Sequence, residues 1–208
     1  MKSSLSRVLP LVEYGVSSVT AEGQIESGDS FLVTPIQDGL LLAVVDGAGH
    51  GAEAAKTSRL AIETLYQHAD EDVIPLIRRC HERLRGSRGA VLGVMCIHGL
   101  DSTLTWLGVG NVEGVLLRDS PSVNPRVETM RLRPGVAGYR LPALQVARTP
   151  IAPGDLLILL TDGIRHDFVR EFSSGDQPGK IAEYISSNFW RGVDDGLVLV
   201  ARYLGSTQ

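Results

Sequence analysis

Two long hydrophobic runs in this sequence end in the same dipeptide, Asp-Gly. The first is LLLAVVDG at residues 40–47, and the second is LLILLTDG at residues 156–163. Short apolar runs of this kind are typical of buried strands, and a glycine at the end permits a sharp turn. A third acidic pair, Asp194-Asp195, precedes the apolar run at residues 197–200. The sequence therefore predicts strand ends that carry separated carboxylates, which are the oxygen ligands that Mg²⁺ and Mn²⁺ prefer.

The length of 208 residues, with no internal repeat, fits a single domain spanning residues 1–208. The net charge of −4 gives no basic field that would favour nucleic acid or an anionic membrane. No apolar run approaches the roughly 20 residues that span a bilayer, and the first ten residues lack the apolar segment of a signal peptide. Cys80 and Cys96 lack CxxC spacing and are expected to be reduced packing residues. We therefore expect a cytoplasmic monomer.

The order of the apolar patterns predicts layers of strands and helices. Residues 30–36 and 40–45 are β-prone and are separated by Asp38-Gly39, a strong hairpin signal that favours an antiparallel sheet. Two amphipathic helices are expected next, with inward faces formed by Ala55, Ser58, Ile62, Leu65 and Ala69, and by Val73, Ile77, Cys80 and Leu84.

The second half of the chain returns to strands. Runs at residues 90–97, 103–109 and 112–117 resemble a meander. A connector rich in proline and glycine follows to residue 142, and then the second Asp-Gly strand, a helix over residues 179–190 and a last strand ending near Leu204. Strands mixed with paired helices indicate an α+β fold rather than a doubly wound βαβ fold.

The three separated acidic sites can be combined into one metal centre. Asp46 could bridge two cations about 3.5–4 Å apart, with Asp162 and Asp194 completing the second site. The Gly47 carbonyl and waters could fill the remaining positions. A pair of cations of this kind activates water for in-line attack on phosphorus, and no nucleophilic side chain is needed. Most Asp-Gly pairs only make turns, and Asp38-Gly39 is expected to be of that kind.

Seven short motifs occur in one order along almost the whole chain. They are SGDSF (27–31), VVDGAGHGAEAA (44–55), RGAVLGV (88–94), GVGNV (108–112), PGVAGYRLP (134–142), LLTDGI (159–164) and DDGLVLV (194–200). In this order and spacing they resemble the metal-dependent PPM (PP2C-like) serine/threonine phosphatases, most closely the small bacterial SpoIIE and RsbX branch. The resemblance implies an α-β-β-α sandwich of two mostly antiparallel sheets flanked by helices. It also implies hydrolysis of phosphoserine or phosphothreonine in proteins.

The same resemblance assigns roles to individual residues. It implies two divalent cations, Mn²⁺ or Mg²⁺, bound by Asp46, Asp162 and Asp194 and by the Gly47 carbonyl, with Asp29 orienting a metal-bound water. The first motif begins at residue 27, which resembles the RsbX type without preceding sensor segments. That type acts in stressosome signalling, so the implied partners are phosphorylated STAS-domain proteins similar to RsbS and RsbR.

Two positions depart from the family pattern. Many larger PPM enzymes have a phosphate-binding arginine where this chain has Gln24. Phosphate could then be held by the metals alone, or by Arg88 or Arg165. The last motif usually has threonine at the position of Leu197, whereas Asp194 keeps its place.

His50, in the sequence GHG, has two interpretations. Its near-neutral ordinary pKa would suit a general acid that protonates the leaving serine oxygen. Other PPM enzymes place the proposed acid at the position of Ala48, so a loop or helix-capping role is the preferred hypothesis. Asn111 is expected to make a structural turn contact and is assigned no catalysis.

Two other functions compete with a phosphatase. DGAGHG is similar to the nucleotide-binding box of GHKL-type ATPases and kinases, but Ala48 occupies the first required glycine and no Asn-box pattern precedes it. A catalytically inactive PPM-like binding module is the second alternative. The retention of all three aspartates argues against it.

Overall fold

The computed structural model describes residues 2–9, 11–170 and 175–205. The strands are β1 (Lys2–Leu9), β2 (Val12–Val19), β3 (Asp29–Ile36), β4 (Gly39–Gly47), β5 (Ala90–His98), β6 (Thr103–Val109), β7 (Glu113–Leu117), β8 (Val127–Thr129), β9 (Ala147–Pro150), β10 (Leu156–Leu160) and β11 (Gly196–Tyr203). The helices are α1 (Gly51–Gln67), α2 (Val73–Arg83) and α3 (Pro178–Phe189), and a 3₁₀ turn, η1, covers Asp167–Arg170.

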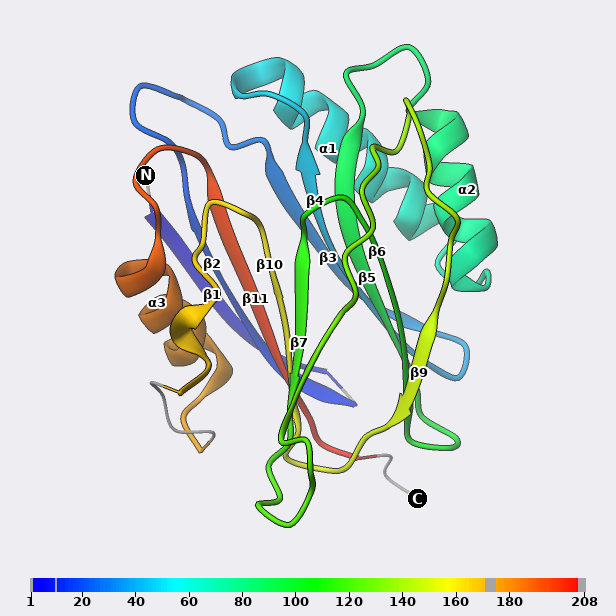
Figure 1. The fold of residues 1–208 in the computed structure, drawn as a ribbon, viewed down its shortest axis with the longest axis vertical. Coiled ribbons are helices and arrows are strands. Elements are labelled where there is room, and N and C mark those ends of the chain that lie inside the picture. Colours follow the sequence, from blue (N-terminus) through cyan, green and yellow to red (C-terminus); the bar gives the residue numbers. More distant parts are fainter. Residues whose placement is uncertain (1, 10, 171–174, 206–208) are drawn as a thin grey trace.

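The strands of the described residues form two sheets that face each other. Their orders are β1-β2-β11-β10-β7-β8 and β3-β4-β5-β6-β9, and every pairing between these strands is antiparallel. Helix α3 covers the outer face of the first sheet, while α1 and α2 cover that of the second (Figure 1). The predicted α+β class and the α-β-β-α sandwich are confirmed.

The two central strands explain the hydrophobic runs of the sequence. Along β4, Leu40, Leu42 and Val44 pack between the sheets, whereas Leu41, Ala43 and Val45 pack toward α1 and α2. Along β10, Leu157 and Leu159 point between the sheets, and Leu156, Ile158 and Leu160 pack toward α3. Both faces of each strand are buried, so polar residues do not alternate with apolar ones as they would in a half-solvated antiparallel sheet.

Part of the predicted strand arrangement was wrong. The expected β3–β4 hairpin forms, with Gln37 and Asp38 in the turn and Gly39 as the first residue of β4, but residues 90–117 do not form a three-stranded meander. Strand β6 already pairs with β5 on one edge and β9 on the other. The chain therefore turns at Gly110, which has φ +92°, and crosses to the other sheet, where β7 pairs with β10.

Two regions contain strands that the sequence patterns did not predict. The hairpin β1–β2 precedes the first motif, and β8 and β9 lie within and after the connector. Strands β8 and β9 are three and four residues long, so their hydrophobic patterns are too short to detect. Strand β1 is largely exposed and carries little apolar patterning.

The two cysteines behave as packing residues. Cys80 and Cys96 are buried in the core between the second sheet and its helices, and neither forms a disulfide. Burial raises the pKa of the Cys80 thiol to about 12 and that of Cys96 to about 11. Thiols with pKa values this high are unreactive at neutral pH.

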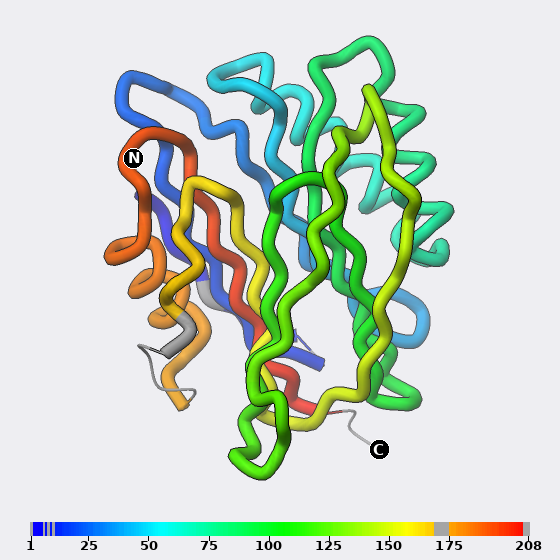
Figure 2. The backbone as a smooth tube through the Cα atoms, in the orientation of Figure 1, coloured from blue at the N-terminus to red at the C-terminus, as the bar shows by residue number. Residues whose placement is uncertain are grey.

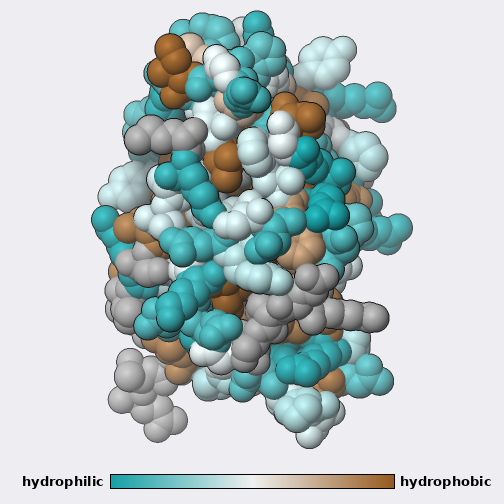
Figure 3. All heavy atoms as spheres, turned by 90° about the vertical axis from the view of Figure 1, so that its left-hand side faces the viewer, coloured by the Kyte–Doolittle hydropathy of each residue, from teal (hydrophilic) through white to brown (hydrophobic). Residues whose placement is uncertain are grey.

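The outer surface on the α3 side carries mostly hydrophilic side chains with small, separated apolar spots (Figure 3). In the part of the chain that the structure describes, no helix is long and apolar enough to cross a membrane.

Candidate functional site

The strand ends that carry aspartates meet at the upper edge of the sandwich, as the backbone trace in Figure 2 shows. Asp29 begins β3 and is the register partner of Asp46 near the end of β4. Asp162 lies two residues after the end of β10, and Asp194-Asp195 directly precede β11. Strands β10 and β11 are antiparallel neighbours, so the end of one lies beside the start of the other. We call Asp29, Asp46, Asp162, Asp194 and Asp195 the carboxylate cluster.

The negative charges within the carboxylate cluster repel one another. Burial raises the pKa of Asp46 to about 7, with further contributions from Asp162, Asp194 and Asp195. Burial, followed by the charge of Asp46, holds the pKa of Asp29 well above its usual value. The pKa of Asp162 is raised by burial and by Asp194, against the lowering effect of Arg191. Folding therefore brings together buried carboxylates that repel one another, and Arg191 offsets this only in part at Asp162.

The donor chemistry of this edge fits hard divalent cations. The side-chain donors are oxygens, which suit Mg²⁺ and Mn²⁺. Within the described residues the side chains do not close into a compact set of three or more acidic, histidine or cysteine ligands. Mg²⁺ usually keeps several waters and binds only one or two carboxylates, so it does not require a compact cage of side chains.

The neighbouring aspartates at the start of β11 have different environments. Asp195 is buried, and its two carboxylate oxygens accept hydrogen bonds from Ala21 N at 2.8 Å and Gly28 N at 2.6 Å. Asp194 is exposed and lines a hollow of about 310 Å³ together with Asp162. Asp194 is therefore placed to reach a ligand, whereas Asp195 holds two backbone segments together.

Two glycines allow the backbone to approach the carboxylate cluster closely. A Cβ on Gly163 would lie 1.8 Å from the carbonyl oxygen of Asp195. A Cβ on Gly47 would lie 2.2 Å from the carbonyl oxygen of Ala54 in the first turns of α1. Both separations are far below van der Waals contact, so the Asp-Gly sequence is required here for packing as well as for turning.

Two side chains at this edge support the cluster in ways that the sequence did not reveal. Asn111 donates a hydrogen bond from Nδ2 to Asp162 Oδ2 at 2.6 Å. Thr161 donates from Oγ1 to Asp29 Oδ2 at 2.8 Å, and the same hydroxyl accepts from Leu197 N at 2.9 Å. The motifs GVGN and LLTDG contain both residues, but sequence spacing alone gives no partner for either.

The side chain of Gln24 lies over the beginning of α1. A Cβ added to Gly51 would lie 2.8 Å from Gln24 Oε1. Arg88 lies against the same loop, since a Cβ added to Gly49 would be 2.7 Å from Arg88 Nη1. Arg88, one of the two arginines suggested as phosphate ligands, therefore lies beside the loop that follows Asp46.

Arg165 is engaged elsewhere. Its guanidinium donates to the Asn188 carbonyl at 3.0 Å, pairs with Asp167 at 3.4 Å, and lies 5.3 Å from the centre of the Phe189 ring. These contacts direct it toward the end of α3. The structure therefore gives no support to Arg165 as a phosphate ligand.

His50 is the N-cap residue of α1, and its side chain is exposed. The backbone is extended there, with φ −141° and ψ 164°, and the side chain makes no capping hydrogen bond. The residue therefore has the capping position that was preferred from the sequence, but its imidazole does not act as the cap.

The raised pKa of Asp46 predicts how the metal-free protein responds to pH. Its folded-state pKa of about 7 exceeds the ordinary value of 3.8, so between these values the folded protein binds more protons than the unfolded chain. The free energy of unfolding should therefore fall as pH rises from about 4 to about 7. Urea unfolding of EDTA-treated protein, compared with Asp46→Asn, checks this. Identical pH slopes for the two proteins would contradict it.

A sandwich of two antiparallel sheets, with aspartates at the strand ends that meet, defines a PP2C-like protein phosphatase. The family model described as Stage II sporulation protein E (SpoIIE) matches residues 36–189. The chain belongs to the SpoIIE family.

Individual relatives agree with this assignment. Phosphoserine phosphatase RsbX of Bacillus subtilis (strain 168) is 30% identical over 176 residues, which cover 83% of this chain and 83% of that protein. A chain from a structure described as the bacterial stressosome, a modular system that has been adapted to control secondary messenger signaling, is 29% identical, with a TM-score of 0.83, covering 92% of this chain and 99% of the other. A structure of RsbX in complex with magnesium has a TM-score of 0.85 at 22% identity, covering 97% and 100%.

Proposed function

We propose that the chain is a metal-dependent phosphatase that removes phosphate from serine or threonine in STAS-domain proteins of a stressosome, similar to RsbS and RsbR. In this proposal residues 1–208 form one catalytic domain that acts as a cytoplasmic monomer and resets partner-switching stress signalling. The observation that carries it is the carboxylate cluster, whose mutually repelling negative charges lie at one edge of a PP2C-like fold.

The residues divide into ligands and supports. Asp46, Asp162 and Asp194, with the Gly47 carbonyl, would hold two divalent cations, Mn²⁺ or Mg²⁺. When bound, such cations supply positive charge for the phosphoryl oxygens and lower the pKa of water for in-line attack. Asp29, buried and hydrogen-bonded to Thr161, is suited to orient a water. Asn111 fixes the carboxylate of Asp162 through its hydrogen bond.

The substrate proposal is supported by the relatives. The RsbX protein of Bacillus subtilis is a phosphoserine phosphatase, and another similar chain comes from a bacterial stressosome structure. The alternative of an ATP-binding GHKL-type kinase does not fit a fold of two stacked antiparallel sheets shared with RsbX. An inactive binding module would have no need for repelling carboxylates at the strand ends. Such carboxylates reduce the stability of the metal-free protein at neutral pH.

Recognition of a protein substrate requires surface near the site, and loops on a rigid scaffold commonly provide it. The segments 119–142 and 165–180 are the candidates. Only part of the first segment reaches the site. Residues 119–126 lie at the opposite end of the sandwich (Figure 1), where Asp119 N donates to Asp155 at the start of β10. Within the second segment, residues 171–174 lie outside the described residues.

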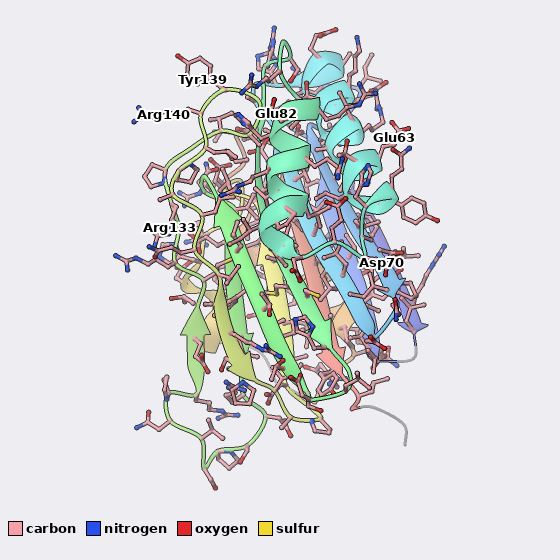
Figure 4. The ribbon with its side chains drawn as sticks, turned by 90° about the vertical axis from the view of Figure 1, so that its right-hand side faces the viewer. Glu63, Asp70, Glu82, Arg133, Tyr139 and Arg140 are labelled. Atoms are coloured by element: carbon pink, nitrogen blue, oxygen red, sulfur yellow. The ribbon has the colours of Figure 1, made fainter. Side chains whose placement is uncertain are left out.

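The remainder of the first segment runs beside the edge of the sandwich that carries the carboxylate cluster. Ala137 pairs with Ala90, whose neighbour Gly89 accepts a hydrogen bond from Ala48 N at 2.9 Å. Figure 4 shows Tyr139 and Arg140 on this loop, pointing away from the protein near the end of α2. Tyr139 is 84% exposed. We propose that residues 131–142 contact the substrate protein.

This placement gives a test of the substrate class. We expect kcat/KM for an intact phosphorylated STAS protein to exceed that for a phosphopeptide copied from its site by at least about tenfold, because remote contacts can raise the rate of the chemical step as well as affinity. Phosphate release with Mn²⁺ measures both. Equal values would mean that the enzyme reads only the local phosphoresidue, and the dedicated-partner proposal would be dropped.

His50→Ala is expected to lower kcat less than about tenfold, because we assign His50 a structural role at the start of α1. A positioned general acid would contribute more than this. The comparison requires phosphoserine, which is a poor leaving group, and p-nitrophenyl phosphate, which is an activated one. A large loss confined to phosphoserine would instead identify His50 as the general acid.

A further inference from the structure

A third arginine, Arg191, lies at the carboxylate cluster and is tied to the Asp162-Gly163 turn at two points. Its backbone N donates to the Gly163 carbonyl at 2.9 Å, and its side-chain Nε donates to the Asp162 carbonyl at 2.8 Å. The adjacent residue Trp190 pairs with Ile164 across an isolated β-bridge. The guanidinium is therefore anchored by the carbonyl of Asp162, a proposed metal ligand, and the Arg191 backbone is tied to the same turn.

Arg191 is exposed and borders a hollow at the carboxylate cluster. Nε is occupied by the Asp162 carbonyl, which leaves the two terminal nitrogens as a planar pair of donors. Arg191 lines the hollow of about 310 Å³ together with Asp162, Gly163, Val193 and Asp194. Among the ion pairs of the described residues, none involves Arg191. A paired donor edge of this kind matches the oxygens of a phosphate in a bidentate fork.

We propose that Arg191 binds the phosphoryl group of the substrate, in place of the arginine that this chain lacks at Gln24. The proposal rests on the phosphatase function proposed above. The ligand class is a phosphate monoester, which the terminal nitrogens of Arg191 would contact in the hollow that Asp162 and Asp194 also line. Arg191 thus orients the phosphate and offsets its negative charge beside acidic side chains.

Neither of the arginines suggested by the sequence has this arrangement. Arg165 is engaged by the Asn188 carbonyl, Asp167 and the Phe189 ring. The side chain of Arg88 lies against Gly49, and no hydrogen bond from it to a backbone group is found in the described part of the protein. Of the three, Arg191 is the one whose side chain donates a hydrogen bond to Asp162 within the described residues.

The test compares Arg191→Ala, Arg191→Gln and the control Arg165→Ala in the full chain. Glutamine can still donate a hydrogen bond to the Asp162 carbonyl but carries no charge and no fork. We expect both Arg191 variants to raise the inhibition constant for inorganic phosphate and the KM for p-nitrophenyl phosphate at least about tenfold. Arg165→Ala should change either value less than about threefold, and Mn²⁺ affinity measured by calorimetry should be unchanged in all variants.

Three results would overturn the proposal. One is a wild-type phosphate affinity in Arg191→Gln, which would show that Arg191 only holds the turn. Another is loss of Mn²⁺ affinity in step with activity, which would make Arg191 a support of the metal site. The third is unchanged phosphate binding in Arg191→Ala. Calorimetric titration of the Mn²⁺-loaded proteins with inorganic phosphate measures phosphate binding even if the wild-type protein hydrolyses no substrate. Failure of the phosphatase proposal can therefore be told apart from failure of the Arg191 proposal.

Discussion

Replacing Asp46 by asparagine is expected to lower turnover at saturating substrate and Mn²⁺ at least about a hundredfold. Asp46 is the register partner of Asp29, and its pKa responds to Asp162, Asp194 and Asp195, so it is coupled to every other part of the carboxylate cluster. An amide keeps the shape of the side chain but removes the negative charge that two cations would share. The change is measured as phosphate release from the phosphorylated substrate.

Asp38→Asn is the matched control, because it makes the same chemical change in the other Asp-Gly pair of the β3–β4 hairpin. Asp38 is exposed at the opposite end of that hairpin from Asp46. Its replacement should leave turnover within about twofold of the wild-type value, as is usual for surface substitutions away from special features. If the Asp46 variant kept more than about a tenth of the wild-type rate, Asp46 would not be the shared ligand.

The second large effect separates the two neighbouring aspartates before β11. Asp194→Asn should lower turnover at least about a hundredfold, as expected for a ligand at a two-metal site, while leaving the protein folded. Asp195→Asn should instead reduce the free energy of unfolding by about 1–3 kcal/mol. Both oxygens of Asp195 accept from backbone N–H groups, so the amide nitrogen of asparagine would face a donor with its own hydrogens.

Urea unfolding and turnover per folded molecule, measured on both variants, distinguish these roles. Circular dichroism establishes the folded fraction. If Asp195→Asn lost turnover without losing stability and Asp194→Asn stayed active, the ligand would be Asp195. The alignment of the last motif would then be shifted by one residue.

The sequence predicted the parts of the fold that depend on residue spacing within a single helix, strand or hairpin. The β3–β4 hairpin, the inward faces of α1 and α2, and the two Asp-Gly strands all follow from residue spacing within one element. The separation of β6 and β7 into different sheets could not be predicted in this way. It depends on which sheet edge is free, and that is settled by the pairing of β9, a strand of four residues far along the chain.

The same division holds for the candidate site. Asp46, Asp162 and Asp194 stand at strand ends, so their chemistry could be predicted from position and type. The hydrogen bonds of Asn111 and Thr161 and the attachment of Arg191 to the Asp162 turn join residues 28 or more positions apart. Their partners are set by how the two sheets stack, which no local pattern contains.

One assay tests metal-dependent phosphate release by this protein directly. Phosphorylated STAS-domain protein is incubated with the wild-type chain, with and without Mn²⁺, and with Asp46→Asn under the same conditions. We predict rapid release by the wild-type chain with Mn²⁺, release near the background when EDTA replaces the metal, and release at least about a hundredfold slower by the variant. Absence of release by the wild-type chain, or equal release by the variant or in EDTA, would contradict the account.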